Sequence, residues 1–134
     1  MKRVLAVFLG LGITLGLAWA VELSEFQPHM KKAAKSVKAL KKQLAAKDAE
    51  GAEASAKNIA MHYGHMTKIW EADNVEDAAK WSQESQAAAS EIAAKVAAGD
   101  FDGAGAAAAT LGKTCRTCHT AHRKKNADKT YSIK

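Results

Sequence analysis

Four stretches of the chain share one pattern of apolar residues. In each stretch they recur at alternating spacings of four and three, which places them along one side of an α-helix. The stripes are Phe26, Met30, Ala33, Val37, Leu40 and Leu44; Ala52, Ala56, Ile59, Tyr63, Met66 and Trp70; Ala78, Trp81, Ser85, Ala88, Ile92 and Val96; and Ala104, Ala108, Leu111, Cys115, Cys118 and His122. Short connections between such helices favour an all-α, antiparallel up-down-up-down four-helix bundle.

Turn and capping residues predict where these helices begin and end. Ser24 followed by Gln27 resembles a capping box, so Ser24 is the expected N-cap of the first helix. That helix should end near residues 48–51, and the second should span about 52–71. The third should begin after an Asn74 N-cap and stop at Gly99, and the fourth should start at Asp100. The polar tail, 126–134, is expected to be frayed.

The first 20 residues of the 134-residue chain have the features of a secretory signal peptide. Lys2 and Arg3 precede an apolar run from Val4 to Leu17, and Ala18-Trp19-Ala20 forms a small-x-small cleavage site. An uncleaved membrane anchor is the alternative, but the run is shorter than the about 20 residues that a span needs. We therefore expect an exported, periplasmic domain of residues 21–134, with no membrane span after cleavage.

The charge of the chain is only mildly basic. The whole chain carries +6, and without Lys2 and Arg3 it has 18 basic and 14 acidic residues, or +4. No arginine-rich run with interleaved aromatic residues is present, so nucleic acid is not an expected partner.

The segment Cys115-Arg116-Thr117-Cys118-His119 is typical of covalent haem attachment. On a helix, two cysteines three residues apart lie about one turn apart on one face, where both thiols can bond the vinyl groups of one porphyrin. His119 is four residues after Cys115, so its imidazole can reach the iron from the same face. We therefore expect one covalent haem c, held by Cys115, Cys118 and His119.

This segment has two alternative interpretations, a zinc site and a redox dithiol. A structural zinc site commonly needs four ligands, and the chain has no third cysteine, although Cys115, Cys118, His119 and His122 could form a crowded local site. A thioredoxin-like redox pair would need a strand-helix-strand context, which the flanking sequence does not indicate.

The predicted stripes contain few large side chains. Alanine stands where leucine would usually fill a bundle core, at Ala33, Ala52, Ala56, Ala78, Ala88, Ala104 and Ala108. Such a bundle is under-packed unless a large apolar group lies within it. We therefore expect the haem-free chain to be loosely packed.

Three segments carry a resemblance to a known family. They are Gly99–Asp102, Leu111–His119 and Ala121–Lys124, and four helical stretches and the N-terminal signal accompany them. Together they resemble the cytochrome c-prime family, the class II c-type cytochromes, in which the haem motif lies near the carboxyl end. The resemblance implies a four-helix bundle with thioethers at Cys115 and Cys118 and a proximal histidine at His119.

Members of this family differ in what meets the other face of the iron. The segment Phe26–Lys31 is similar to that of the low-spin members, with Met30 at the position of the sixth ligand, and it lacks the first-helix arginine of typical c-prime proteins. In a bundle, Met30 would face the motif on the last helix. The alternative is a core methionine that fills a gap.

The four histidines other than His119 are expected at different positions. His29 is about 100 degrees around the helix from Met30, so it should point beside the stripe, as a solvated or propionate-contacting residue. His62 and His65 are expected on the surface or rim of the second helix, and His122 at the rim or near a propionate. Met66 is expected in the core and is the third-choice iron ligand.

These observations predict a monohaem cytochrome that carries single electrons and is not an enzyme. A five-coordinate protein that binds nitric oxide or carbon monoxide is the alternative, and a helical zinc protein is the third possibility. The expected partner is a periplasmic redox protein whose acidic docking surface would meet the first-helix lysines together with Arg116, Arg123, Lys124 and Lys125. A homodimer is compatible with the resemblance.

Overall fold

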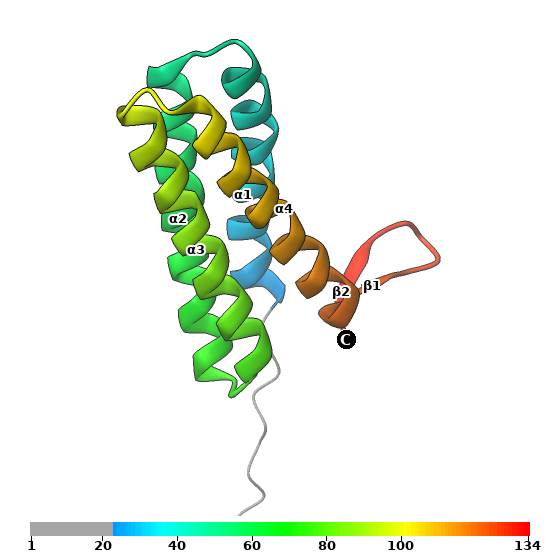
Figure 1. Ribbon diagram of the computed structural model, residues 1–134. Helices are drawn as coiled ribbons and strands as arrows, with labels where there is room; N and C mark the ends of the chain where they lie inside the picture. The colour runs from blue at the N-terminus through cyan, green and yellow to red at the C-terminus, as the bar shows by residue number, and fades with distance from the viewer. Residues whose placement is uncertain (1–22) are drawn as a thin grey trace, which may run out of the picture.

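Four helices make up most of residues 23–134, the part of the chain that the computed structural model describes (Figure 1). They are α1 (Leu23–Ala45), α2 (Ala49–Ala72), α3 (Glu76–Ala97) and α4 (Phe101–His122). The prediction of an all-α chain with four helices is confirmed. The predicted signal peptide, residues 1–20, lies outside the described residues.

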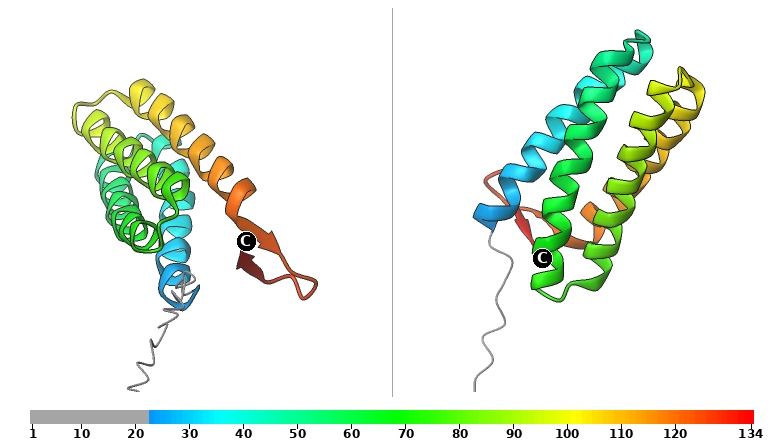
Figure 2. Two further views of the ribbon diagram at one scale, coloured as in Figure 1. Left: turned by 90° about the horizontal axis from the view of Figure 1, so that it is seen from below. Right: turned by 90° about the vertical axis from the view of Figure 1, so that its left-hand side faces the viewer.

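Consecutive helices lie side by side and run in opposite directions. Helix α2 packs against α1 and α3, and α3 packs against α4, whereas α1 and α4 make few contacts. Two views show that α4 slants away from α1 towards its carboxyl end (Figures 1 and 2). Helices α1 and α4 therefore lie farther apart at the end that carries Cys115–His119.

The burial of the predicted stripes depends on how many close neighbours each helix has. All six stripe residues of α2 are buried, and so are those of α3 except Trp81. In α1 and α4 the stripes are mixed, and the partly buried residues are Met30, Val37, Leu44, Ala108, Cys115, Cys118 and His122. A stripe on a helix with one close neighbour is only partly covered.

The turn between α1 and α2 differs from the prediction. Lys47 has a positive φ of 52°, and Asp48 is the N-cap of α2, where its carboxylate accepts a hydrogen bond of 3.0 Å from the Gly51 N–H. Helix α2 therefore begins at Ala49 rather than near residue 52. Helix α1 already includes Leu23, the residue before the expected N-cap Ser24.

Asn74 and Asp100 show two ways of beginning a helix. Asn74 has a positive φ of 57°, so it turns the chain, and Val75 occupies the N-cap position of α3 without a side-chain bond. The prediction of Asn74 as N-cap was wrong by one residue, since asparagine suits both positions. Helix α4 starts where predicted, and Asp100 is its N-cap, because its carboxylate accepts a hydrogen bond of 2.8 Å from the Gly103 N–H.

The tail beyond α4 forms a hairpin, contrary to the prediction of a frayed end. Strand β1 (Arg123–Lys125) pairs with the antiparallel strand β2 (Tyr131–Ile133). The Asn126 N–H donates to the Thr130 carbonyl at 2.9 Å within the turn. The Arg123 guanidinium also lies 4.4 Å from the centre of the Tyr131 ring, a cation–π contact that polarity alone does not reveal.

Within residues 23–134, none of the helices is long and apolar enough to cross a membrane.

Candidate cofactor site

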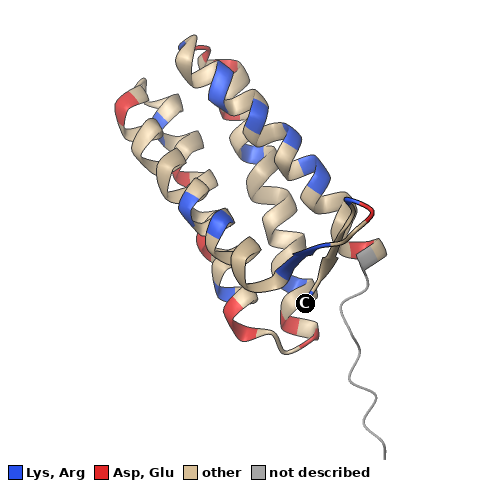
Figure 3. Ribbon diagram, turned by 90° about the vertical axis from the view of Figure 1, so that its right-hand side faces the viewer, with Lys and Arg blue, Asp and Glu red and all other residues tan. Residues whose placement is uncertain are grey.

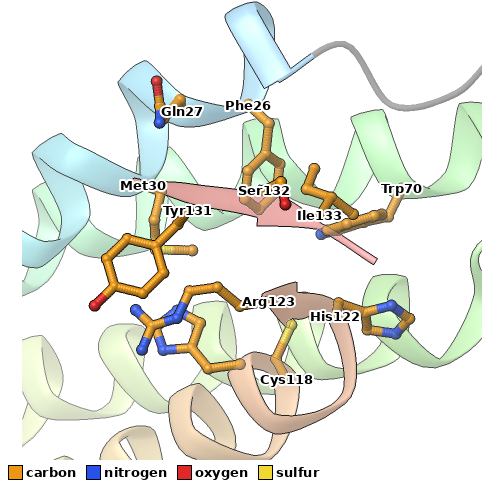
Figure 4. Close-up of a pocket in the computed structure, with 11 residues that line it drawn as sticks. Phe26, Gln27, Met30, Trp70, Cys118, His122, Arg123, Tyr131, Ser132 and Ile133 are labelled. Carbon is orange, nitrogen blue, oxygen red and sulfur yellow. The ribbon is translucent and has the colours of Figure 1, made fainter. Parts of the chain in front are cut away.

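A cavity of about 80 Å³ lies between the start of α1, the end of α4 and the hairpin (Figure 4). Met30 and Cys118, from facing helices, both point into it. Its lining residues are Phe26, Gln27, Met30, Trp70, Cys118, His119, His122, Arg123, Tyr131, Ser132 and Ile133. The hairpin, absent from our prediction, therefore forms one wall of the cavity.

A second, smaller cavity shares part of this lining. Phe26, Met30, Cys118 and His119 border both cavities, and Tyr63, Trp81, Ser82, Ser85 and Cys115 line only the second. The structure thus brings Met30 of α1 to the same two spaces as Cys118 and His119 of α4. Met66, in contrast, is fully buried in the core and lines neither cavity.

The two cysteines lie on one helix, but their surroundings differ. The Cys115 sulfur is 3.0 Å from the hydroxyl oxygen of Tyr63, a buried residue of α2. Burial, followed by the neighbouring Cys115 and Asp77, raises the pKa of the Cys118 thiol to about 11. Cys118 is therefore a neutral thiol near pH 7, well below the pH range in which it would ionise.

His119 is a half-buried imidazole beside a cation. Burial is the main cause that lowers its pKa, and the positive charge of Arg123 adds to this effect. Both causes favour the neutral ring, the form in which histidine can bind a metal.

His122 is held at the edge of the site by Asp77. Its Nε2 lies 3.0 and 3.1 Å from the two carboxylate oxygens of Asp77, at the start of α3. Its ring is also 5.5 Å from that of Trp70 and 6.0 Å from that of Trp81, measured between centres. His122 is a rim residue, as expected, and it joins the ends of α3 and α4.

Trp70 presents a buried donor that has no partner among the described residues. The side chain is 2% exposed, its Nε1–H makes no hydrogen bond, and the residue lines the larger cavity. An unmade hydrogen bond of this kind costs about 1–3 kcal/mol. A ligand with an acceptor oxygen in the cavity would satisfy the donor.

The prediction for His62 was wrong. This residue is only 5% exposed, because α1 lies over this part of α2 and brings His29 against it, with the two Nδ1 atoms 3.0 Å apart. His65 is exposed, as predicted, and its ring stacks on that of His29. The position of His62 next to the stripe residue Tyr63 was the available signal, but it could not show which flank α1 covers.

Among residues 23–134, no three or more His, Cys, Asp or Glu side chains are grouped so that they could hold a metal ion. This finding does not favour the alternative of a zinc site at Cys115, Cys118, His119 and His122. The donors present instead are two thiols, an imidazole and a thioether at one pair of cavities, beside an unpartnered indole N–H. Thiols, an imidazole and a thioether are the donor types that c-type haem sites use.

Neither a protein-family model, nor a curated protein, nor a solved structure matches this chain.

Proposed function

We propose that this chain is an exported, periplasmic monohaem c-type cytochrome that carries single electrons, related to the low-spin members of the cytochrome c-prime family. The observation that supports the proposal is the meeting of Met30 with Cys118 and His119 at two shared cavities. These residues come from opposite ends of the sequence. In the bundle they supply the two kinds of donor that a six-coordinate haem iron needs.

Each donor has a distinct role in this proposal. The thiols of Cys115 and Cys118 would hold the porphyrin as thioethers, the His119 imidazole would bind the iron, and the Met30 thioether would bind it from α1. The haem iron supplies the one-electron chemistry when bound. A methionine ligand raises the reduction potential, and no catalytic base or nucleophile is required.

The other residues of the site determine its dielectric and its charge. Phe26 and Ile133 contribute apolar walls. Low solvent access would raise the free energy of the more highly charged oxidation state of the iron. The Trp70 N–H is available to a porphyrin carboxylate, and Arg123 adds positive charge nearby. Each of these groups would change the reduction potential of the haem without binding the iron.

Attachment of a porphyrin requires movement of the hairpin. The cavity of about 80 Å³ is too small to hold a porphyrin. Tyr131 and Ile133, which belong to β2, line the cavity from its outer side. Ile133 packs against the core, and the Lys134 N–H donates to the His122 carbonyl at 2.8 Å, so the hairpin would have to give up these contacts.

A cationic surface supports an acidic redox partner. The lysines of α1 are exposed, and none takes part in the ion pairs found among residues 23–134; they are Lys31, Lys32, Lys35, Lys38, Lys41 and Lys42. Arg123, Lys124 and Lys125 are exposed on β1, and Figure 3 shows both groups of basic residues. Such a surface would speed the encounter with an acidic protein, and high salt would remove the effect.

Mass spectrometry and absorption spectroscopy of exported protein test the proposal. We expect the mature polypeptide mass plus one haem, together with a low-spin spectrum that has a sulfur-to-iron band. Met30→Ala should abolish that band, whereas Met61→Ala, at an exposed methionine of α2, should not. A bare polypeptide mass would refute the haem. A high-spin ferric spectrum that responds to nitric oxide would instead support the gas-binding alternative.

A further inference from the structure

Three histidines meet on the side of the bundle where α1 crosses α2. The Nδ1 atoms of His29 and His62 are 3.0 Å apart, and their ring centres are 5.3 Å apart. The ring of His65 stacks on His29, with 4.7 Å between centres and 18° between planes. None of the three lines either cavity of the candidate haem site.

The separation of the two Nδ1 atoms suits a shared metal ion. Histidine nitrogens bind metals at about 2.0–2.1 Å. Two nitrogens 3.0 Å apart can both reach one ion at that distance with nearly a right angle between the bonds. A right angle is the geometry of square-planar sites, which Cu²⁺ and Ni²⁺ favour, and Cu²⁺ binds most strongly in the divalent series.

We propose that His29 and His62 chelate Cu²⁺ through their Nδ1 atoms, with water in the remaining positions. In the metal-free pair, one imidazole donates its Nδ1–H to the other. On binding, that ring loses the Nδ1 proton and keeps or gains one at Nε2, so that both rings offer an Nδ1 lone pair. His65 is not a ligand in this proposal; its stacked ring positions His29.

Charge near the pair opposes binding of a cation. The positive charge of Lys32, one turn after His29 on α1, is felt by both His29 and His62. Its removal should therefore strengthen Cu²⁺ binding. This dependence distinguishes the proposed site from copper bound elsewhere on the chain.

The test uses the full exported chain, with Cys115 and Cys118 occupied as thioethers. If mass spectrometry shows free thiols, they are alkylated first, so the result does not depend on the proposed haem. Cu²⁺ is titrated calorimetrically, and electron paramagnetic resonance records the nitrogen hyperfine pattern. We expect one site with two equivalent or near-equivalent nitrogen ligands and weaker binding of Zn²⁺.

Variants locate the site. His29→Gln or His62→Gln should weaken binding on the order of 10²-fold, since a chelate becomes a single ligand. His122→Gln, at a histidine that contacts Asp77 and neither member of the pair, should leave the Cu²⁺ affinity unchanged. Lys32→Gln should raise the affinity. His29→Gln alone decides the outcome if the buried His62 variant does not fold. Equal affinity in wild type and His29→Gln, or no nitrogen hyperfine pattern, would overturn the proposal.

Discussion

The hydroxyl oxygen of Tyr63 lies 3.0 Å from the sulfur of Cys115, and this contact joins the middle of α2 to the first thiol of the Cys115–His119 segment. Tyr63 is buried, and its pKa is raised, first by burial and then by the neighbouring Cys115. The neutral hydroxyl therefore persists at any ordinary pH and can direct the thiol.

Tyr63→Phe tests the strength of this contact. The substitution removes one buried hydrogen bond, so the free energy of unfolding of the haem-free chain should fall by about 1 kcal/mol. Urea unfolding measures the change. Tyr131→Phe, which alters an exposed tyrosine, is the matched control and should have little effect. Equal stabilities of the Tyr63 variant and the wild type would show that the contact contributes nothing.

A chain that ends at Lys125 tests the role of the hairpin as a wall. Without Tyr131 and Ile133 the Cys118 thiol gains solvent, so its pKa should fall from about 11 towards the ordinary value. Alkylation of Cys118 in the haem-free chain should then be roughly tenfold faster or more at neutral pH. Cys115, which does not line the hairpin cavity, is the internal control. An unchanged Cys118 rate would show that the hairpin does not cover it.

Trp70→Phe separates the haem-free from the haem-loaded protein. In the haem-free chain the substitution removes a donor that is already unpaired, which offsets part of the lost packing. In the loaded protein it should also remove a hydrogen bond to a porphyrin carboxylate. We therefore expect a larger loss of unfolding free energy in the loaded form, by about 1–3 kcal/mol. Trp81→Phe, at a half-buried tryptophan of α3, should not show this difference.

Asp100 should make the stability depend on pH in the acid range. The Gly103 N–H, followed by the Lys95 ammonium group, lowers the pKa of Asp100 below its ordinary 3.8. The carboxylate therefore stabilises the folded chain above that value, and the stabilisation is lost as the pH falls through the lowered folded pKa. Asp100→Asn keeps a capping oxygen but not the charge. The variant should be less stable than the wild type at pH 5, and this difference in stability should shrink as the pH falls to about 2. Thermal melts at several pH values measure the difference.

The alanine-rich core predicts a difference in cooperativity between the haem-free and haem-loaded proteins. Ala33, Ala52, Ala56 and Ala104 are all at most 1% exposed, so small side chains fill the positions between the helices. Thermal melts should be broad for the haem-free chain and sharp for the loaded protein. Similar, sharp melts of both forms would contradict this expectation.

Much of the fold was predictable because helix periodicity is a local property. The stripes of α2 and α3 are buried almost as their spacing predicts, and Asp100 begins α4 where its capping chemistry places it. The predictions were wrong at residues whose local sequence is compatible with two structures. Asn74 can cap a helix or adopt a positive φ, and the bundle connection selected the turn. His62 lies beside a stripe, and only the position of α1 decides that it is buried.

The sequence by itself determined the four helices and the order of donors along α4. The spacing of Cys115, Cys118 and His119 acts within one helical turn, where geometry is nearly invariant. The bundle prediction expected Met30 to face the motif, and the structure brings it to the cavities of His119. Tertiary structure alone decided that Tyr131 and Ile133 line the cavity of Cys118 and that His29 meets His62. These relationships join residues far apart in the chain. They depend on how α4 slants from α1 and where the hairpin folds, which no local pattern encodes.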